Sequence, residues 1–245
     1  MIEPDLSGRV ALVTGSATGL GRATLLALAE CGADVAVQYH TSEDAAAVVA
    51  ATAREAGVEA TALQADVTDP EAVEDLVGAV EDRLGTVDVL VNNVGDFAPA
   101  HWADLSVADW RRVVETNLYG TYLCSRRTLP AMREAGWGRV INVGYASSEK
   151  GLVSPKNFPY FAAKSGVVMF TRMLAADTRE DGITVNAVSP YVLEDSEEFP
   201  DELPRGRPAA FADALQPILF FLEADSGYVS GQNVEVHGGW LPERV

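Results

Sequence analysis

The regular alternation of short apolar runs with longer helical stretches constrains this chain more than any other feature. Runs rich in β-branched residues predict strands at residues 9–14, 34–39, 59–65, 87–91, 139–143 and 184–188, and residues 233–236 could add a seventh. Several runs are apolar at consecutive positions, which is typical of strands covered on both faces. Strands that alternate with helices form βαβ units. The sequence therefore predicts an α/β fold, with one doubly wound parallel sheet flanked by helices on both faces, in a single domain over residues 1–245.

Helices are expected between these strands, at residues 20–31, 42–56, 70–84, 108–133, 160–179 and 210–223. Asp69-Pro70 offers an N-cap followed by proline in the first helical turn, while Gly85 and Gly136 stand where helices should end. The one irregular stretch, residues 190–208, is rich in Pro, Asp and Glu. We expect it to form a surface loop or lid.

Charge and cysteine content exclude several classes of protein. Thirty-six acidic residues against 18 Lys and Arg give a formal charge of −18, which repels nucleic acid and argues against a basic membrane-binding surface. Two cysteines cannot build a disulfide framework in 245 residues and suggest a reducing compartment. The first residues lack a signal-peptide pattern, and no apolar run approaches the roughly 18 residues of a membrane span. We therefore expect a cytoplasmic protein without membrane or nucleic-acid partners.

A glycine-rich turn follows the first expected strand, in the sequence Thr14-Gly15-Ser16-Ala17-Thr18-Gly19-Leu20-Gly21. Glycines allow a tight turn and a close approach of a pyrophosphate to the backbone, and the helix that follows offers unpaired N–H groups at its start. A turn of this kind without any ligand is the alternative. The residues expected to contact a phosphate are Gly15, Ser16, Thr18, Gly19, Leu20 and Gly21.

Four further motifs occur along the chain after this turn. Asp66-Val67 follows the third expected strand, and Asn92-Asn93-Val94-Gly95 follows the fourth. Asn117 stands inside a long expected helix, and Tyr160-Phe161-Ala162-Ala163-Lys164 begins the next one. Together with the glycine turn, these motifs resemble the short-chain dehydrogenase/reductase family over essentially the whole chain. The resemblance implies a Rossmann-like fold, a nicotinamide cofactor and a cleft at the carboxyl ends of the strands.

The resemblance also implies roles for individual residues. Tyr160 would donate a proton to a substrate carbonyl, Lys164 would lower the pKa of that phenol and bind the nicotinamide ribose, and Asn117 would support a proton relay. Residues four apart share one face of a helix, and a nearby ammonium favours a phenolate. Cofactor contacts are implied, beside Tyr160 and Lys164, at Asp66, Val67, Asn93, Gly95, Pro190 and Val192.

The serine that polarises the substrate carbonyl in this family has no unambiguous equivalent here. Counting forward along residues 138–143 reaches Tyr145 at the serine position, whereas counting back from Tyr160 reaches Ser147. We favour Tyr145, because loops absorb insertions more easily than strands change register. A phenol can also donate a hydrogen bond. Ser147 remains the alternative, and Tyr191 stands where the family has a glycine beside the nicotinamide.

Cofactor preference is expected to depend on the end of the second strand. No acid stands in Gln38–Ser42, where the family's NAD-dependent members hold the ribose hydroxyls with a carboxylate. NADP(H) is therefore expected, with contacts from Tyr39, His40 and Thr41, and NAD(H) is the alternative. His40 could equally be a plain surface residue. The other histidines have no partners at metal-ligand spacing, so no metal site is expected.

The expected function is reversible hydride transfer between NADP(H) and a small-molecule carbonyl or alcohol, as in a ketoreductase. The alternatives are non-redox chemistry on the same fold, such as epimerisation, cyclisation or dehydration, and a catalytically inactive cofactor-binding module. The resemblance also implies a homo-oligomer, either a tetramer or a dimer. Aromatic residues that could line the substrate pocket are Phe97, Trp102, Phe199 and Trp240.

Overall fold

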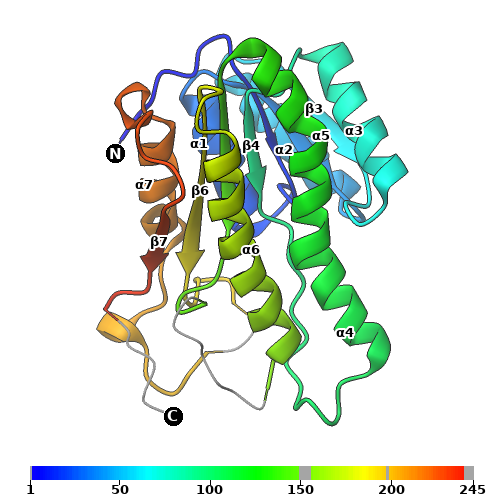
Figure 1. Cartoon of the computed structure of the whole chain (residues 1–245), viewed down its shortest axis with the longest axis vertical. Helices are drawn as coiled ribbons and strands as arrows, with labels where there is room; N and C mark the ends of the chain where they lie inside the picture. The colour runs from blue at the N-terminus through cyan, green and yellow to red at the C-terminus, as the bar shows by residue number, and fades with distance from the viewer. Residues whose placement is uncertain (1, 149–155, 197–198, 240–245) are drawn as a thin grey trace.

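A single seven-stranded sheet forms the centre of the computed structural model, which describes residues 2–148, 156–196 and 199–239 (Figure 1). All the strand pairs are parallel, in the order β3-β2-β1-β4-β5-β6-β7. The strands are β1 (Val10–Val13), β2 (Asp34–Tyr39), β3 (Ala60–Gln64), β4 (Val89–Asn92), β5 (Gly138–Val143), β6 (Ile183–Pro190) and β7 (Asn233–Val236). The predicted parallel sheet is confirmed, including its seventh strand.

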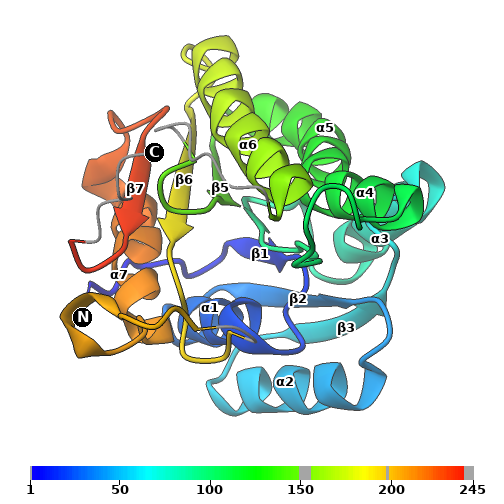
Figure 2. The ribbon, with the colours of Figure 1, turned by 90° about the horizontal axis from the view of Figure 1, so that it is seen from below.

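Helices cover both faces of this sheet, as Figure 2 shows in a view from below. On one face lie α1 (Gly19–Glu30), α2 (Glu43–Glu55) and α7 (Phe211–Leu222). On the other lie α3 (Pro70–Arg83), α4 (Val107–Val114), α5 (Gly120–Ala135) and α6 (Phe158–Asp177). Asp69 caps α3 by accepting a hydrogen bond from the Glu71 N–H at 2.9 Å. The doubly wound architecture therefore matches the sequence prediction.

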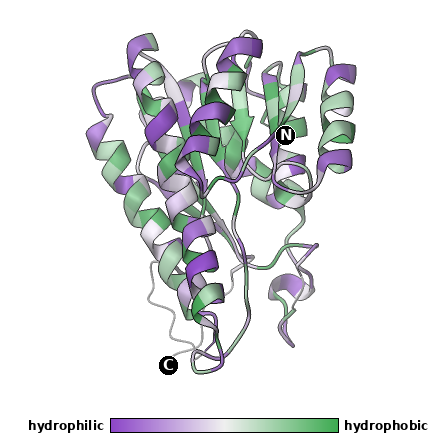
Figure 3. Cartoon of the chain, turned by 90° about the vertical axis from the view of Figure 1, so that its right-hand side faces the viewer, coloured by the Kyte–Doolittle hydropathy of each residue, from purple (hydrophilic) through white to green (hydrophobic). Residues whose placement is uncertain are grey.

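Consecutive apolar residues in the strands supply two hydrophobic layers. Val35 and Val37 pack against α1 and α2, whereas Ala36 between them packs against the layer under α3 and α5. Side chains alternate between the two faces of a strand, so a strand covered on both sides needs apolar residues at every position. Figure 3 shows this pattern as hydrophobic strands enclosed by helices with hydrophilic outer surfaces.

One turn of π-helix interrupts the long helix predicted at residues 108–133. This turn, η1 (Glu115–Tyr119), joins α4 to α5 without a break and holds Asn117 in a fully buried position. The Thr121 hydroxyl donates to the Asn117 carbonyl at 2.9 Å. Single π-turns inside helices frequently occur at functional sites, because the extra residue rotates a side chain out of the regular helical pattern.

The segment after the sixth strand is partly regular. β6 continues through Pro190, so the first residue of the loop predicted at 190–208 belongs to the strand, and a 3₁₀ turn covers Pro204–Gly206. Residues 197–198 of that loop, and Trp240, lie outside the described residues. In the part of the chain that the structure describes, no helix has the length and apolarity needed to cross a membrane.

Candidate active site

The glycine-rich turn connects β1 to α1 at the carboxyl edge of the sheet. Gly15 and Gly19 have φ angles of +63° and +56°, a left-handed conformation that favours glycine. A Cβ atom on Gly21 would clash with the Gly15 carbonyl, so only glycine allows this close approach of helix and turn. The Asn93 amide donates to the Thr14 carbonyl at 3.0 Å. The left-handed conformations of the two glycines and the hydrogen bond from Asn93, the residue after β4, therefore fix the shape of the turn.

A cavity of about 410 Å³ extends from this turn across the ends of β2, β3 and β4. Most residues predicted to contact the cofactor line it: Gly15, Thr18, Gly19, Leu20, Tyr39, His40, Thr41, Asp66, Val67, Asn93 and Gly95. Ser16 and Gly21 do not. The Ser16 hydroxyl is buried and donates to the Val13 carbonyl at 2.7 Å. Ser16 and Gly21 therefore fix the conformation of the turn without lining the cavity.

Gln38 lines the same cavity and was not singled out from the sequence. Its buried side chain accepts a hydrogen bond from the Gly15 N–H at 2.7 Å and donates one to the Ala65 carbonyl at 2.7 Å. It therefore ties the glycine turn to the end of β3. The available signal was a single polar residue inside an otherwise apolar strand, where burial requires hydrogen-bond partners.

The outer end of this cavity carries a histidine and a carboxylate. His40 Nε2 lies 4.0 Å from Asp66 Oδ2. Burial acts to raise the pKa of Asp66, but hydrogen bonds from Thr68 and the proximity of His40 outweigh it, and the pKa is lowered. Asp66 is therefore ionised at neutral pH. No Arg or Lys lines this cavity within the described ranges.

A second cavity of about 530 Å³ adjoins the first and is lined by three tyrosines, Tyr145, Tyr160 and Tyr191. The Tyr160 ring centroid lies 5.5 Å from that of Tyr145 and 5.1 Å from that of Phe97, both in edge-on geometry. Burial raises the pKa of Tyr160 and of Tyr145 above the usual range. Phe97 and Phe199, two of the aromatic residues considered for the substrate pocket, line this cavity. Val192 lines it as well, although it was expected to contact the cofactor.

Trp102, Pro190 and Ser147 do not reach this cavity, and Asn117 and Lys164 lie next to Gly95 without lining it. Trp102 is 65% exposed and is not part of the lining. Pro190 lies in β6, where its carbonyl accepts from the Ala146 N–H at 3.0 Å, and it lines neither cavity. Ser147 is fully buried with a φ of +68°, and its hydroxyl has no hydrogen-bond partner among the described residues.

Tyr145 and Ser147 are thus separated by the fold. The Tyr145 ring lies beside that of Tyr160, whereas the Ser147 N–H donates to Glu235 Oε1 at 2.8 Å, toward β7. Of the two candidates for the serine position, only Tyr145 lines the cavity that contains Tyr160.

Lys164 lies one helical turn after Tyr160 and is almost completely buried. Its Nζ donates to the Val143 carbonyl at 2.7 Å and lies 5.7 Å from the centroid of the Tyr160 ring. Burial lowers the pKa of Lys164 to about 8. The expected lowering of the Tyr160 pKa by this ammonium is wrong for this structure, because desolvation of the phenol raises it instead.

Gly95 is the point where the two cavities meet, since it lines both. A Cβ atom there would clash with Asn117 Oδ1 and would lie 3.1 Å from Lys164 Nζ. Asn117 Nδ2 donates to the carbonyls of Asp96 and Val113, at 2.8 and 2.9 Å. Its buried Oδ1 has no partner within the described part of the chain. An unpaired buried acceptor beside an ammonium is suited to hold a water molecule.

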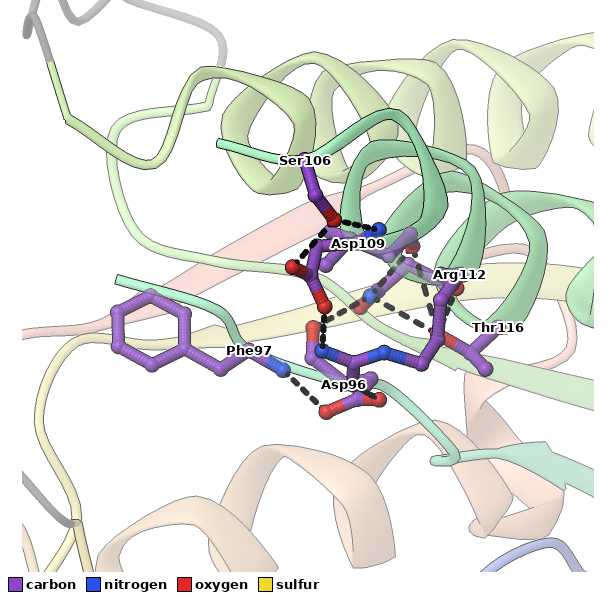
Figure 4. A network of polar contacts seen from close by, with 8 residues as sticks. Asp96, Phe97, Ser106, Asp109, Arg112 and Thr116 are labelled. Carbon is purple, nitrogen blue, oxygen red and sulfur yellow. Dashed lines mark hydrogen bonds and ion pairs between the residues drawn. The ribbon is translucent and has the colours of Figure 1, made fainter. Parts of the chain in front are cut away.

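A polar network fixes the segment that follows Gly95 (Figure 4). Arg112 on α4 forms ion pairs with Asp96 and with Asp109, the latter at 2.9 Å. The Ser106 hydroxyl caps α4 by accepting from the Asp109 N–H at 3.0 Å. Asp96 in turn accepts from the Phe97 N–H at 2.8 Å. The network therefore anchors the ring that packs against Tyr160.

The comparisons with known proteins agree on one family. The model of the short chain dehydrogenase family matches residues 9–199. A 3-oxoacyl-[acyl-carrier-protein] reductase from Synechocystis sp. is 35% identical, over 96% of this chain and 98% of the relative. Nodulation protein G from Azospirillum brasilense is 34% identical over the same shares of the two chains.

A solved structure shares the fold across nearly all of its length. Acetoin dehydrogenase from Salmonella typhimurium is 28% identical, with a TM-score of 0.88 over 97% of this chain and 98% of the other. The family model covers most of the chain, and relatives at 34–35% identity span nearly all of it. The chain therefore belongs to the short-chain dehydrogenase/reductase family of oxidoreductases.

Proposed function

We propose that this protein is an NADP(H)-dependent oxidoreductase that interconverts a small-molecule carbonyl and its alcohol. The observation that carries the proposal is the convergence of Tyr160, Lys164 and Asn117 around Gly95, where the two cavities meet. A reaction that transfers a hydride and a proton to one carbonyl needs a dinucleotide site and a proton donor side by side. Bound NADP(H) would supply the hydride.

The first cavity has the features that a dinucleotide requires. Gly15 and Gly19 line this cavity, where residues without a Cβ allow close approach of a diphosphate to the backbone. The start of α1 offers N–H groups from which an anion can accept hydrogen bonds. Tyr39, His40, Thr41, Asp66 and Val67 line the end that would take the adenosine. Asn93 and Gly95 line the path between the two ends.

Tyr160 is assigned as the proton donor. Its raised pKa keeps the phenol protonated at neutral pH, which suits the direction in which a carbonyl is reduced. Lys164 has a pKa of about 8 and a buried location next to Asn117, so it can exchange a proton near neutral pH and restore that of Tyr160 through a relay. Tyr145 is assigned as the second hydrogen-bond donor to the substrate oxygen, with Ser147 as the alternative.

Preference for NADP(H) over NAD(H) is part of the proposal and rests on the residues after β2. The chain has no carboxylate in Gln38–Ser42, and Tyr39, His40 and Thr41 provide polar groups there instead. Asp66 also lines this region and lies opposite His40. His40 is thus the one basic side chain of the described lining that could face a 2′-phosphate.

One observation favours a second candidate function. Tyr145 lines the cavity and is a bulky phenol with a raised pKa. The family resemblance implies a small serine at its position. A crowded cavity of this kind could instead direct non-redox chemistry, such as epimerisation or dehydration, on the same fold. Absorbance of the nicotinamide during turnover separates the two candidates, because only net redox chemistry changes it.

The proposed function is tested with cofactor titration and one variant. NADPH should bind at least tenfold more tightly than NADH, about 1.4 kcal/mol, in a titration followed by tryptophan fluorescence. A 3-oxoacyl thioester and a small diketone, suggested by the names of the relatives, should be assayed for NADPH oxidation. Failure of both nucleotides to bind would contradict the proposal.

Tyr160→Phe should lower kcat by on the order of 10² to 10⁴ while cofactor affinity stays within about twofold, since only the phenolic oxygen is removed. Tyr228→Phe is the matched control, because Tyr228 is fully exposed and lines neither cavity. Equal turnover of the two variants would refute the role of Tyr160.

A further inference from the structure

Asp195 reaches from the segment after β6 to the glycine-rich turn, at the start of α1. Its Oδ2 lies 2.7 Å from the position that a Cβ atom would take on Gly19, the first residue of α1. Asp195 also lines the aromatic cavity together with Tyr160. Its carboxylate therefore lies where the proposed diphosphate site borders the proposed substrate site.

No residue of the described chain neutralises this carboxylate. Within the described residues, Asp195 makes no hydrogen bond or ion pair, in contrast to Asp96 in the same cavity, which pairs with Arg112. No Arg or Lys of the described chain lines either cavity, and the buried Lys164 lies beside Gly95 outside both linings. Asp195 is exposed, and no cation of the described residues lining the two cavities offsets its charge.

The start of α1 explains why a carboxylate is favourable there in the free protein. The first turn of α1 contains no acidic residue, and the side chain of its N-cap, Thr18, makes no capping hydrogen bond. Unpaired N–H groups and the positive end of the helix dipole attract an anion, worth typically 0.3–1 kcal/mol. The same N–H groups would hold the diphosphate of a dinucleotide.

We propose that Asp195 sets the affinity of the cofactor site, because its carboxylate competes with the cofactor diphosphate for the start of α1. This inference rests on the proposed function, since it concerns the same dinucleotide. Binding then requires the Asp195 side chain to withdraw from Gly19. The charge weakens binding of the reduced and oxidised cofactor alike, because both carry the same diphosphate.

The test compares the full-length protein with Asp195→Asn, which keeps the shape of the side chain and removes its charge. Asp201→Asn is the matched control, because it removes the same charge from an exposed position in the same segment. Dissociation constants of NADPH and NADP⁺ are measured by titration calorimetry at low and high salt, and inorganic pyrophosphate is used as a probe of the diphosphate subsite alone.

Asp195→Asn should bind NADPH, NADP⁺ and pyrophosphate more tightly, roughly three- to fivefold at low salt, and the gain should shrink at high salt. Asp201→Asn should stay within about twofold of the wild type. Unchanged or weaker binding of all three ligands by Asp195→Asn would overturn the inference.

A selective loss of NADP⁺ affinity in Asp195→Asn would also overturn it, because it would mean that the carboxylate faces the cationic nicotinamide ring and not the diphosphate. A failure of the proposed function can be distinguished from a failure of this inference. If neither the wild type nor Asp195→Asn bound either dinucleotide, both the proposed function and this inference would fall, whereas equal binding by the two proteins would overturn the inference alone.

Discussion

At the residue scale, the free-energy cost of burying a charge determines the protonation states of Tyr145, Tyr160 and Lys164. Burial moves the pKa of the phenols of Tyr145 and Tyr160 upward and that of the Lys164 ammonium downward, so both shifts favour the neutral form. The family's expected electrostatic effect, an ammonium that lowers the pKa of a phenol, is outweighed here. Lys164 Nζ donates its hydrogen bond to the Val143 carbonyl and lies 5.7 Å from the centroid of the Tyr160 ring.

Exchange of Tyr145 for phenylalanine tests which residue takes the serine position. Tyr145→Phe should lower kcat/KM roughly ten- to a thousandfold, the effect of losing one preorganised hydrogen-bond donor. Ser147→Ala should be nearly silent, because the Ser147 hydroxyl is buried outside the cavity lining. Steady-state kinetics with the best carbonyl substrate measures both variants. The opposite pattern would assign the role to Ser147.

Removal of the Lys164 charge should change how stability depends on pH. In the folded protein Lys164 loses its proton near pH 8, against an ordinary value of 10.5, so the unfolded chain binds more protons in between. Stability contributed by this group therefore rises with pH across that window, by on the order of 1–3 kcal/mol. In Lys164→Met this rise should be absent.

Urea unfolding at pH 7 and pH 10, with no nucleotide added, measures this effect as the difference between wild type and Lys164→Met. The comparison cancels the titration of all groups that the two proteins share. A constant difference between the two free energies of unfolding would show that Lys164 does not titrate in this range.

At the scale of elements, the site is assembled by turns and loops that the strands hold at one edge. The π-turn η1 brings Asn117 under Gly95, and the end of α4 holds the segment of Asp96 and Phe97 through Arg112. The hydrogen bond from Asn117 Nδ2 to the Asp96 carbonyl joins the two at 2.8 Å. One side of the aromatic cavity therefore depends on ion pairs formed outside it.

Arg112→Met should loosen this side of the cavity. We expect KM for the carbonyl substrate to rise roughly three- to tenfold, with kcat and cofactor affinity changed by less than about twofold. Stability should fall by less than about 1 kcal/mol, because the Arg112 pairs are largely solvent-exposed. Arg111→Met is the control, since among the described residues Arg111 pairs with Glu115 alone, at 4.0 Å.

Equal KM values for Arg112→Met and Arg111→Met would contradict the role given to the network. A parallel fall of kcat and cofactor affinity in Arg112→Met would instead indicate a general loss of structure.

Elements with a local signal could be predicted from the sequence, and contacts between distant polar residues could not. The strands follow from consecutive apolar residues, and the glycine turn follows from its spacing, because both depend on neighbours in the chain. The pairing of Gln38 with Gly15 and the position of Asp195 over Gly19 join residues from separate elements. These partners cannot be identified from the sequence until the order of the strands in the sheet is known.

At the scale of the whole molecule, one helical face remains apolar without a covering layer. Met169 and Met173 on α6 are 71% and 53% exposed, and Tyr122 on α5 packs edge-on against Phe170 at a centroid distance of 6.1 Å. Tyr119 stacks on Tyr122 at 6.0 Å in the same region. Contiguous exposed apolar surface of this kind favours association.

We expect this face of α5 and α6 to join copies of the chain, as a tetramer or a dimer, because a closed symmetric interface buries the same patch on both subunits. The double variant Met169→Glu, Met173→Glu should place carboxylates opposite each other across that interface and shift the protein to a smaller assembly. Val48→Glu is the control, because Val48 is an exposed apolar residue of α2 on the other face of the sheet. Sedimentation velocity at micromolar concentration measures all three proteins. A monomeric wild type would refute the expected assembly, and an unchanged assembly in the double variant would show that the subunits associate through a different surface.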